Sequence, residues 1–118
     1  MKTLVVGASL KEERYSNKAI NMLREYGHEV VAHGLKEGKV LDVDIFKDWK
    51  NYEDVDTVTL YLNPTRQEEL YDDIIKLHPR RVIFNPGTEN SLFVSLLSKN
   101  DIQSEEACTL VLLRTEQY

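Results

Sequence analysis

The first 34 residues place a strand, a helix and a second strand in immediate succession. Residues 2–6 (KTLVV) form an apolar run that ends at Gly7, as expected of a buried parallel strand. From Ser16 onward, apolar residues three and four positions apart predict a helix with one buried face, and Gly27 is well placed to end it. Residues 28–34 (HEVVAHG) predict the second strand. A unit of this kind joins two parallel strands by a right-handed crossover.

The same alternation continues through the second half of the chain. Residues 55–62 (VDTVTLYL) are rich in β-branched and aromatic residues and predict a central strand. Asn63-Pro64 then supplies a helix cap and a first-turn proline. Residues 80–84 (RRVIF) predict another strand, and a helix follows it as far as Asn100. The remaining segments (DIQ and CTLVLL) are expected to add one short strand and a terminal segment.

Residues 35–54 carry the weakest pattern of the chain. A short strand is expected near KVLDV, residues 39–43, and a polar helical turn around FKDWKNYED, residues 46–54.

Strands that alternate with short helices predict an α/β fold with a doubly wound, mostly parallel sheet of five or six strands and helices on both faces, that is, a Rossmann-like fold. A length of 118 residues fits one domain, residues 1–118, and no Pro, Gly or Ser tract suggests a linker. In such sheets, ligands bind beyond the carboxyl ends of the strands where the strand order reverses. For this chain, that place is beside the first strand.

The charge of the chain limits its partners. Fifteen Lys and Arg against 20 Asp and Glu give a net charge of −5, so no broad basic surface is available for a nucleic acid. The apolar run that ends at Ala8 is too short for a signal peptide core or a membrane span, so we expect a cytoplasmic protein that does not bind membranes. Cys108 is the only cysteine, which excludes an internal disulfide and a cysteine-rich zinc site.

The turn after the first strand contains Gly7, Ala8 and Ser9. Backbone amides and the positive end of the following helix dipole favour an anion there, close to Lys11 and Arg14. The alternative is an ordinary tight turn with solvated charges.

Two functions that are common in this fold, dinucleotide binding and phosphate acceptance on a carboxylate, do not fit the residues of this turn. A dinucleotide loop requires G-x-G-x-x-G and an acidic residue at the end of the second strand, whereas this chain has one glycine and ends the strand with His33-Gly34. A phospho-acceptor domain requires carboxylates at the end of the first strand, where Val6 and Gly7 stand.

Two later turns reach the same edge. Asn63, Pro64 and Arg66 could line the crevice, although Asn63 and Pro64 are also expected as the start of a helix. In residues 84–90 (FNPGTEN), Gly87 permits the close approach of a ligand, and the alternative is a helix entry capped by Thr88.

No catalytic or metal-binding group of residues is predicted. The histidines are scattered, without the spacing of a metal site or a partner for a triad. Cys108 is either a nucleophile, a thiol that pairs with a ligand thiol, or a small buried apolar residue.

The pattern G-A-S-x-x-x-x-R-x-S at residues 7–16, followed by NKAINMLREYGHEV, resembles the start of the small single-domain CoA-binding proteins of bacteria. Their fold is shared with the CoA-binding domain of the succinyl-CoA synthetase alpha subunit. The likeness extends to the segment DVDTVTLYLNPTRQEEL and to Cys108, which matches a cysteine often found near the end of these proteins.

The resemblance implies coenzyme A or an acyl-CoA as the ligand. It implies a turn that binds the pyrophosphate, side chains that contact the phosphates, and a crevice lined by the turn after residues 55–62. In this chain the expected site residues are Gly7, Ala8, Ser9, Arg14, Ser16, Asn17, His33, Asn63, Pro64 and Arg66. The family commonly has Asn-Pro after the second strand, where this chain has His33-Gly34. CoA carries its own phosphates, so it gains from a helix N-terminus with nearby cations and needs no acid for a ribose 2′-hydroxyl.

Three functions follow as hypotheses. The first is a binding module for CoA without catalysis of its own. The second is an acyl- or thiol-transfer protein that uses Cys108. The third is an NAD(P)-binding protein with an atypical loop. A homodimer is compatible with the sequence, which identifies no protein partner.

Overall fold

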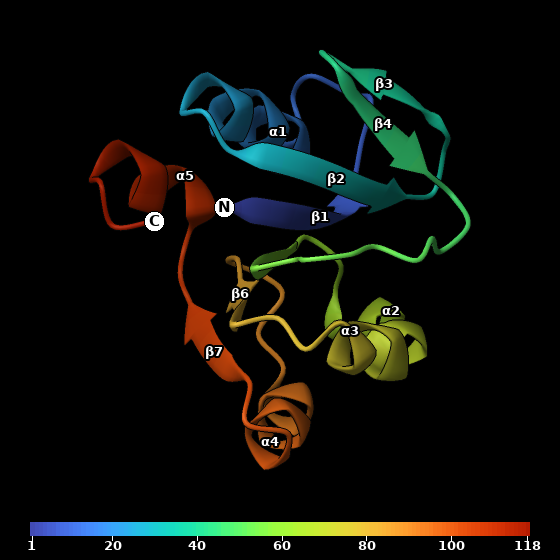
Figure 1. Cartoon of the computed structure of the whole chain (residues 1–118), viewed down its shortest axis with the longest axis vertical. Helices are drawn as coiled ribbons and strands as arrows, with labels where there is room; N and C mark the ends of the chain where they lie inside the picture. The colour runs from blue at the N-terminus through green and yellow to red at the C-terminus, as the bar shows by residue number, and fades with distance from the viewer.

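One sheet of seven strands, in the order β3-β4-β2-β1-β5-β6-β7, carries helices on both faces (Figure 1). The computed structural model describes residues 1–118. In chain order the elements are β1 (Lys2–Ala8), α1 (Tyr15–Glu25), β2 (Glu29–Gly34), β3 (Gly38–Val40), β4 (Val43–Phe46), β5 (Thr57–Leu60), α2 (Pro64–Gln67), the 3-10 turn η1 (Glu68–Leu70), α3 (Tyr71–Leu77), β6 (Arg81–Phe84), α4 (Ser91–Lys99), β7 (Gln103–Glu106) and α5 (Thr109–Arg114). The predicted α/β, doubly wound, Rossmann-like fold is confirmed.

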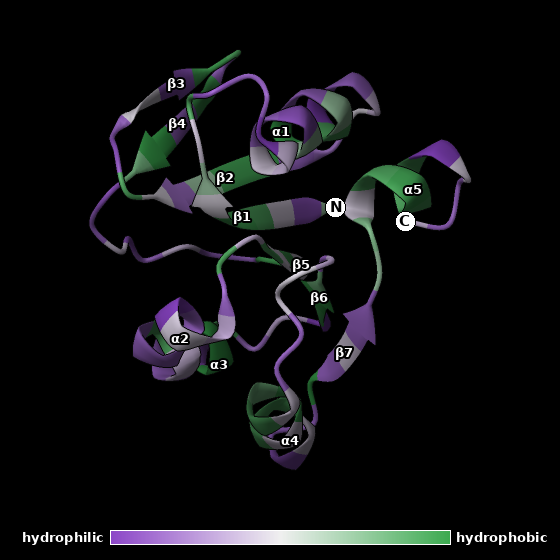
Figure 2. Ribbon diagram, turned by 180° about the vertical axis from the view of Figure 1, so that it is seen from behind, coloured by the Kyte–Doolittle hydropathy of each residue, from purple (hydrophilic) through white to green (hydrophobic).

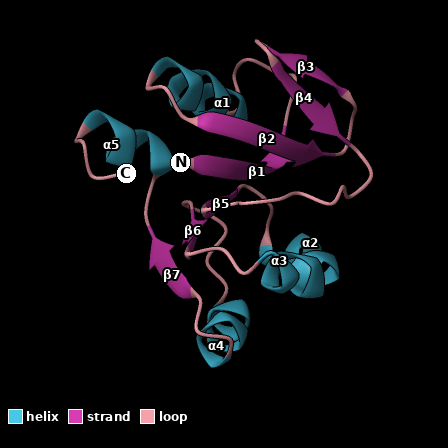
Figure 3. Cartoon of the chain, in the orientation of Figure 1, coloured by secondary structure: helices cyan, strands magenta, loops and turns pink.

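Every pairing in the sheet is parallel except that between β3 and β4, which form an antiparallel hairpin at one edge (Figure 3). The sheet has seven strands instead of the predicted five or six because this hairpin contributes two strands. The expected short strand near residues 39–43 is in fact two strands that meet at Leu41, whose φ of 54° allows the tight reversal.

The helical turn predicted around residues 46–54 is wrong. After β4 the chain runs without a helix as far as β5, and Trp49 and Tyr52 pack against the hydrophobic core. Burial of these two aromatic rings outweighs the helical preference of the polar residues around them, because each ring removes a large apolar area from water.

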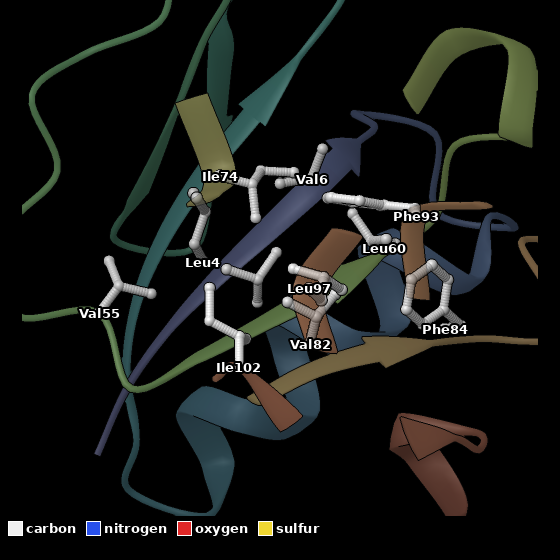
Figure 4. Packing of buried hydrophobic residues seen from close by; sticks show 11 residues of the cluster. Leu4, Val6, Val55, Leu60, Ile74, Val82, Phe84, Phe93, Leu97 and Ile102 are labelled. Carbon is white, nitrogen blue, oxygen red and sulfur yellow. The ribbon is translucent and has the colours of Figure 1, made fainter. Parts of the chain in front are cut away.

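The two faces of the sheet have separate cores. On one face, α1 and α5 bury Ile20, Leu23 and Leu113 against the strands. On the other, α3 and α4 bury residues that include Ile74 and Phe93 (Figure 4). Figure 2 shows hydrophobic residues along β1, β2 and β4 and over much of α4 and α5, whereas β7 and α2 are mostly hydrophilic.

The C-terminal segment is a helix followed by a docked tyrosine. The segment CTLVLL forms most of α5, which buries Leu110, Leu112 and Leu113. Beyond it, the Tyr118 hydroxyl is hydrogen-bonded to the Thr3 hydroxyl, and the Tyr118 ring lies 4.6 Å from the Arg81 guanidinium carbon. Both ends of the chain therefore meet at the amino edge of the sheet, away from the carboxyl edge. None of the helices has the length and apolar character needed to cross a membrane.

Candidate functional site

The strand order reverses at β1. The chain passes from β1 to β2 on one side of it and later returns to β5 on the other side. Because these strands are parallel, the segments that follow them meet at one carboxyl edge, which is the usual ligand site of such sheets. The structure thus brings the predicted site residues of all three segments to a common edge: Gly7, Ala8, Ser9, Arg14, Ser16 and Asn17 after β1, His33 in β2, and Asn63, Pro64 and Arg66 after β5.

Gly7 creates a bulge near the end of β1. Its φ is +92°, and the pairing of β1 with β2 shifts register between Val6 and Ala8. A Cβ atom at Gly7 would lie 3.0 Å from the carbonyl carbon of Tyr61, so any side chain would crowd the turn after β5. The bulge also turns Ala8 toward the α1 face of the sheet, where it joins Val5 in the core. Only glycine fits this position without strain.

Hydrogen bonds within the turn hold its shape. The Ser9 hydroxyl accepts a hydrogen bond from the Lys11 amide at 3.1 Å, and the Asn17 side-chain amide donates to the Ser9 carbonyl at 3.0 Å. The Asn17 side-chain oxygen accepts from Asn21 at 3.0 Å. Ser9 and Asn17 therefore fix the path of the chain into α1, and Asn17 is buried beneath it.

The first turn of α1 leaves its backbone amides free. The Lys18 amide donates to the Arg14 carbonyl at 3.1 Å, but the amides of Tyr15, Ser16 and Asn17 have no partner within the protein. Arg14, at the N-cap, provides no side-chain cap, and no acidic residue stands in the first turn. An uncapped helix start of this kind has unsatisfied donors and the positive end of the helix dipole, which together favour an anion.

Several cations around this edge have no carboxylate partner. The ion pairs of the protein involve Lys2, Arg24, Lys39, Arg80 and Arg81. Lys11 and Arg14, in the turn that enters α1, and Arg66, in α2, are exposed and take no part in them. Lys18 lies over the Tyr15 ring, 5.4 Å from its centroid. These groups are available to a ligand without first breaking an ion pair.

The turn after β5 starts a helix with an Asn cap and a first-turn proline, as the sequence predicts. The Asn63 side-chain oxygen accepts a hydrogen bond from the Arg66 amide at 3.0 Å, and Pro64 occupies the first helical position of α2. Asn63 thereby caps α2 and fixes the direction in which the backbone presents Arg66. Both Pro64 and Arg66 are exposed.

A buried network of amides behind this turn was missed by sequence reasoning. Gln67 is fully buried, and its side chain donates to the Leu62 carbonyl at 2.9 Å and to the Thr88 carbonyl at 2.8 Å. Its oxygen accepts from Asn90 at 2.9 Å. The network joins the turn after β5 to the loop before α4. Nothing local distinguishes Gln67 from an exposed helix residue, because two of its three partners lie 21 and 23 positions away.

A second network connects β5, β6 and the start of α5. The Asn85 side chain donates to the Thr59 hydroxyl at 2.6 Å and to the Leu60 carbonyl at 2.9 Å, and it accepts from the Thr109 amide at 2.9 Å. The Thr88 hydroxyl donates to the Asn85 carbonyl at 2.7 Å. Thr88 is thus not the cap of the following helix.

The cap of α4 is Asn90, whose side-chain oxygen accepts from the Phe93 amide at 3.2 Å. The loop between Asn85 and Asn90 is longer than the sequence pattern indicated. Gly87 has a φ of +92°, and its surroundings are open enough that an added Cβ would meet no atom within 4 Å.

His33 is partly buried near the end of β2. Burial is the main reason that its pKa lies below its ordinary value, and nearby Asp73 and Asp48 act in the opposite direction. The Nδ1 atom of His33 is buried and has no hydrogen-bond partner.

Cys108 is the N-cap of α5 and is partly exposed, with no other cysteine to pair with. It follows β7, so it also stands at the carboxyl edge, and its neighbour Thr109 is anchored to Asn85. Near it, the hydroxyl of Tyr61 is buried without a partner, and burial raises the pKa of Tyr61. No group of three His, Cys, Asp or Glu residues could hold a metal ion.

A cavity of about 550 Å³ lies along the outer side of α1, toward the β3–β4 hairpin and α5. Its lining includes Asn17, but none of the other predicted site residues. The glycine turn, Arg14 and Ser16 therefore lie outside the lining of this cavity.

The comparisons with known proteins agree with the fold and identify the family. The model of the CoA binding domain family matches residues 1–114. No curated protein matches the chain.

Several solved structures resemble the chain. An uncharacterized protein is 44% identical, with a TM-score of 0.96 over 99% of this chain and 97% of that protein. A protein from Thermus thermophilus is 18% identical, with a TM-score of 0.84 over 99% of this chain and 90% of that one.

A dinucleotide forming acetyl-coenzyme A synthetase 1 of Ca. Korarchaeum cryptofilum, in complex with phosphate and ADP, is 15% identical. Its TM-score is 0.74, over 90% of this chain and 25% of that enzyme. At this identity the likeness shows the fold alone. The match of the family model along nearly the whole chain goes further: this chain belongs to the CoA binding domain family.

Proposed function

We propose that this protein binds coenzyme A or an acyl-CoA at the carboxyl edge of its sheet, with the ligand diphosphate at the start of α1. The observation that carries the proposal is the set of unpartnered amides of Tyr15, Ser16 and Asn17 at the point where the strand order reverses. Membership of the CoA binding domain family supports the choice of CoA among the anions that could bind there.

Each wall of the crevice has a role in this proposal. Gly7, Ala8 and Ser9 let the diphosphate approach the backbone, and Arg14 supplies a charge-assisted hydrogen bond. Ser16 contributes its amide at the first turn of α1. On the opposite side, Asn63, Pro64 and Arg66 line the path of the remainder of the ligand. The absence of an acidic residue at the end of β2 favours CoA over NAD, because CoA requires no acceptor for a ribose 2′-hydroxyl.

We further propose that the protein holds its ligand without chemistry of its own. A second candidate is thiol exchange, because Cys108 stands at the same carboxyl edge and is partly exposed. In that reaction the Cys108 thiolate attacks a sulfur of a CoA disulfide, a mixed disulfide forms, and the other thiol leaves. A mass increase that is present in the native protein and absent in Cys108→Ala would favour the second candidate.

A thermal shift experiment tests the main proposal. The unfolding midpoint is measured with CoA, acetyl-CoA, dephospho-CoA, NAD and NADP at equal concentrations. A ligand at 100 times its dissociation constant adds about 2.7 kcal/mol to the free energy of unfolding, which raises the midpoint by several degrees in a domain of this size.

We expect this increase with CoA and acetyl-CoA, and none with NAD or NADP. A shift produced by the nicotinamide nucleotides alone would replace the proposal with the NAD(P) hypothesis. No shift with any of these compounds at millimolar concentration would remove CoA binding altogether.

A further inference from the structure

Three hydrogen bonds connect the side chain of Asn21, in the middle of α1, to the turn that enters this helix. The Asn21 side-chain amide donates to the backbone carbonyl of Asn17 at 2.9 Å and to the side-chain oxygen of Asn17 at 3.0 Å. The Asn17 side-chain amide in turn donates to the Ser9 carbonyl at 3.0 Å. We call this series of contacts, from Asn21 through Asn17 to Ser9, the asparagine relay.

Backbone acceptors fix the orientation of both side-chain amides in the relay. A backbone carbonyl can only accept a hydrogen bond, so the group of Asn21 that faces the Asn17 carbonyl is its NH2 group. For the same reason, the group of Asn17 that faces the Ser9 carbonyl is its NH2 group. The Asn17 side-chain oxygen is then left to accept from Asn21. Asn17 is only 4% exposed, so water competes little for these contacts, and Asn21 is the group that holds the Asn17 amide in this orientation.

The relay decides which polar group the turn leaves free. The peptide bond between Ser9 and Leu10 is trans, so its carbonyl and its N–H point in opposite directions. The carbonyl points to Asn17, and the Leu10 N–H therefore points away from Asn17. This N–H donates to no group in the protein, whereas the next amide, that of Lys11, donates to the Ser9 hydroxyl at 3.1 Å. The turn thus presents a free donor where a rotated peptide would present a carbonyl oxygen.

The choice between a donor and an acceptor matters for an anion. A phosphate accepts hydrogen bonds from backbone amides and is repelled by carbonyl oxygens. The Leu10 amide belongs to the segment that leads from Gly7 into α1, where the amides of Tyr15, Ser16 and Asn17 are also free. Rotation of the Ser9–Leu10 peptide would therefore replace an attraction by a repulsion at the approach to this helix.

We propose that Asn21 is a positioning residue for the anion site at the start of α1. Through Asn17 it holds the Ser9 carbonyl away from the ligand and leaves the Leu10 amide to donate to a ligand phosphate. Asn17 then acts through the turn instead of touching the ligand. This inference rests on the proposed CoA function and identifies the residues that make the turn select an anion.

Titration calorimetry with CoA measures the contribution of the relay. Asn21→Leu keeps the approximate size of the side chain and removes both of its hydrogen bonds without adding a charge. We expect CoA binding to weaken by about 3- to 10-fold, the equivalent of one net hydrogen bond.

The matched control is Asn100→Leu. Asn100, at the C-cap of α4, donates to the Leu96 carbonyl four positions earlier at 2.8 Å, so the control removes the same kind of bond away from the proposed site. It should leave the affinity unchanged, and an equal loss in Asn100→Leu and Asn21→Leu would overturn the inference.

A double-mutant cycle tests whether Asn21 acts through Asn17. Asn17→Ala alone should weaken binding at least as much as Asn21→Leu does. Adding Asn21→Leu to Asn17→Ala should cause no further loss, because the residue through which Asn21 acts is already gone. Additive losses, or an unchanged affinity in Asn21→Leu, would overturn this inference alone. Failure of CoA to bind the native protein would overturn the proposed function as well.

An NMR experiment keeps the test independent of how well the Asn17→Ala variants fold. The Leu10 amide resonance of the native protein should move on saturation with CoA, because this amide gains a hydrogen bond to a phosphate. In Asn21→Leu saturated with CoA, the displacement should be smaller. A Leu10 resonance that does not respond to CoA in the native protein, or that moves equally in both proteins, would contradict the inference directly.

Discussion

Gly34 abuts the backbone of Ala8: a Cβ atom on Gly34 would stand 2.3 Å from the Ala8 carbonyl oxygen. The contact is with backbone, so the clash cannot be relieved by rotating a side chain. We expect Gly34→Ala to lower the free energy of unfolding by about 1 to 3 kcal/mol, the usual cost of overpacking, and to weaken CoA binding by displacing the turn. Urea unfolding and calorimetry measure the two effects.

The control for this prediction is Gly38→Ala. The three atoms nearest to a Cβ atom there all belong to the side chain of Leu10, which is 43% exposed and can move. Equal destabilisation in the two variants would show that the close approach of Gly34 to Ala8 has no special cost.

Arg14 is expected to contribute to CoA affinity and little to stability. Its side chain is exposed and forms no ion pair. Arg14→Ala should weaken binding by about 1.5 to 3 kcal/mol, the range for a hydrogen bond to a charged group. Titration calorimetry measures the affinity. Lys99→Ala, at the far end of α4, makes the same change in net charge and should alter the affinity little; an equal loss in both would indicate a general charge effect instead.

Asn85 should stabilise the carboxyl edge more than Asn63 does. Asn85→Ala leaves the buried Thr109 amide and the buried end of β5 without their partner, at about 1 to 3 kcal/mol for each unsatisfied group. Asn63→Ala removes an exposed helix cap, at about 0.5 to 2 kcal/mol. Urea unfolding of both variants tests the order. A smaller loss for Asn85→Ala would mean that water or rearrangement satisfies the groups it leaves.

Asp56 makes the stability of the protein depend on pH at the amino edge of the sheet. Arg80 donates to both of its carboxylate oxygens at 3.0 Å, and this hydrogen bonding is the main reason that the pKa of Asp56 is lowered from its ordinary value of 3.8. A lowered pKa stabilises the fold above pH 3.8, and the stabilisation is lost as the pH falls from there through the folded-state value.

The free energy of unfolding of the native protein should therefore exceed that of Asp56→Asn at pH 7. Because the ion pair of Asp56 and Arg80 is partly exposed, we expect a difference of only about 1 kcal/mol, and this difference should disappear at low pH. Urea unfolding at pH 7, pH 4 and pH 3 measures this difference. A difference that does not change with pH would show that Asp56 acts through packing or neutral hydrogen bonds.

Much of this molecule can be read from local pattern. The apolar run before Gly7, the helical spacing from Ser16 and the pair Asn63-Pro64 predict a strand, a helix and a capped turn, and all are present. These elements depend on residues within a few positions of each other, so the sequence carries their signal directly. Alternation of such elements was enough to predict the sheet and the edge where its ligand site is expected.

The segment at 46–54 shows where local pattern fails. Its polar residues favour a helical turn, but Trp49 and Tyr52 pack against the core. The Trp49 ring meets the rings of Tyr52 and of His33, in β2, edge to face. The stability of that arrangement comes from contacts that no local window contains.

What the sequence by itself determined is the strand-helix-strand unit of the first 34 residues, the strands and helices between residues 55 and 100, the glycine turn after β1 and the positions of the cations around it. What only the tertiary structure decided is which side chains become buried partners, as with Gln67 and Thr88, and which groups are left without one, as with the amides at the start of α1. The reason is physical: local conformation depends on neighbouring residues in the chain, whereas burial and hydrogen bonding depend on groups that meet only after the chain has folded.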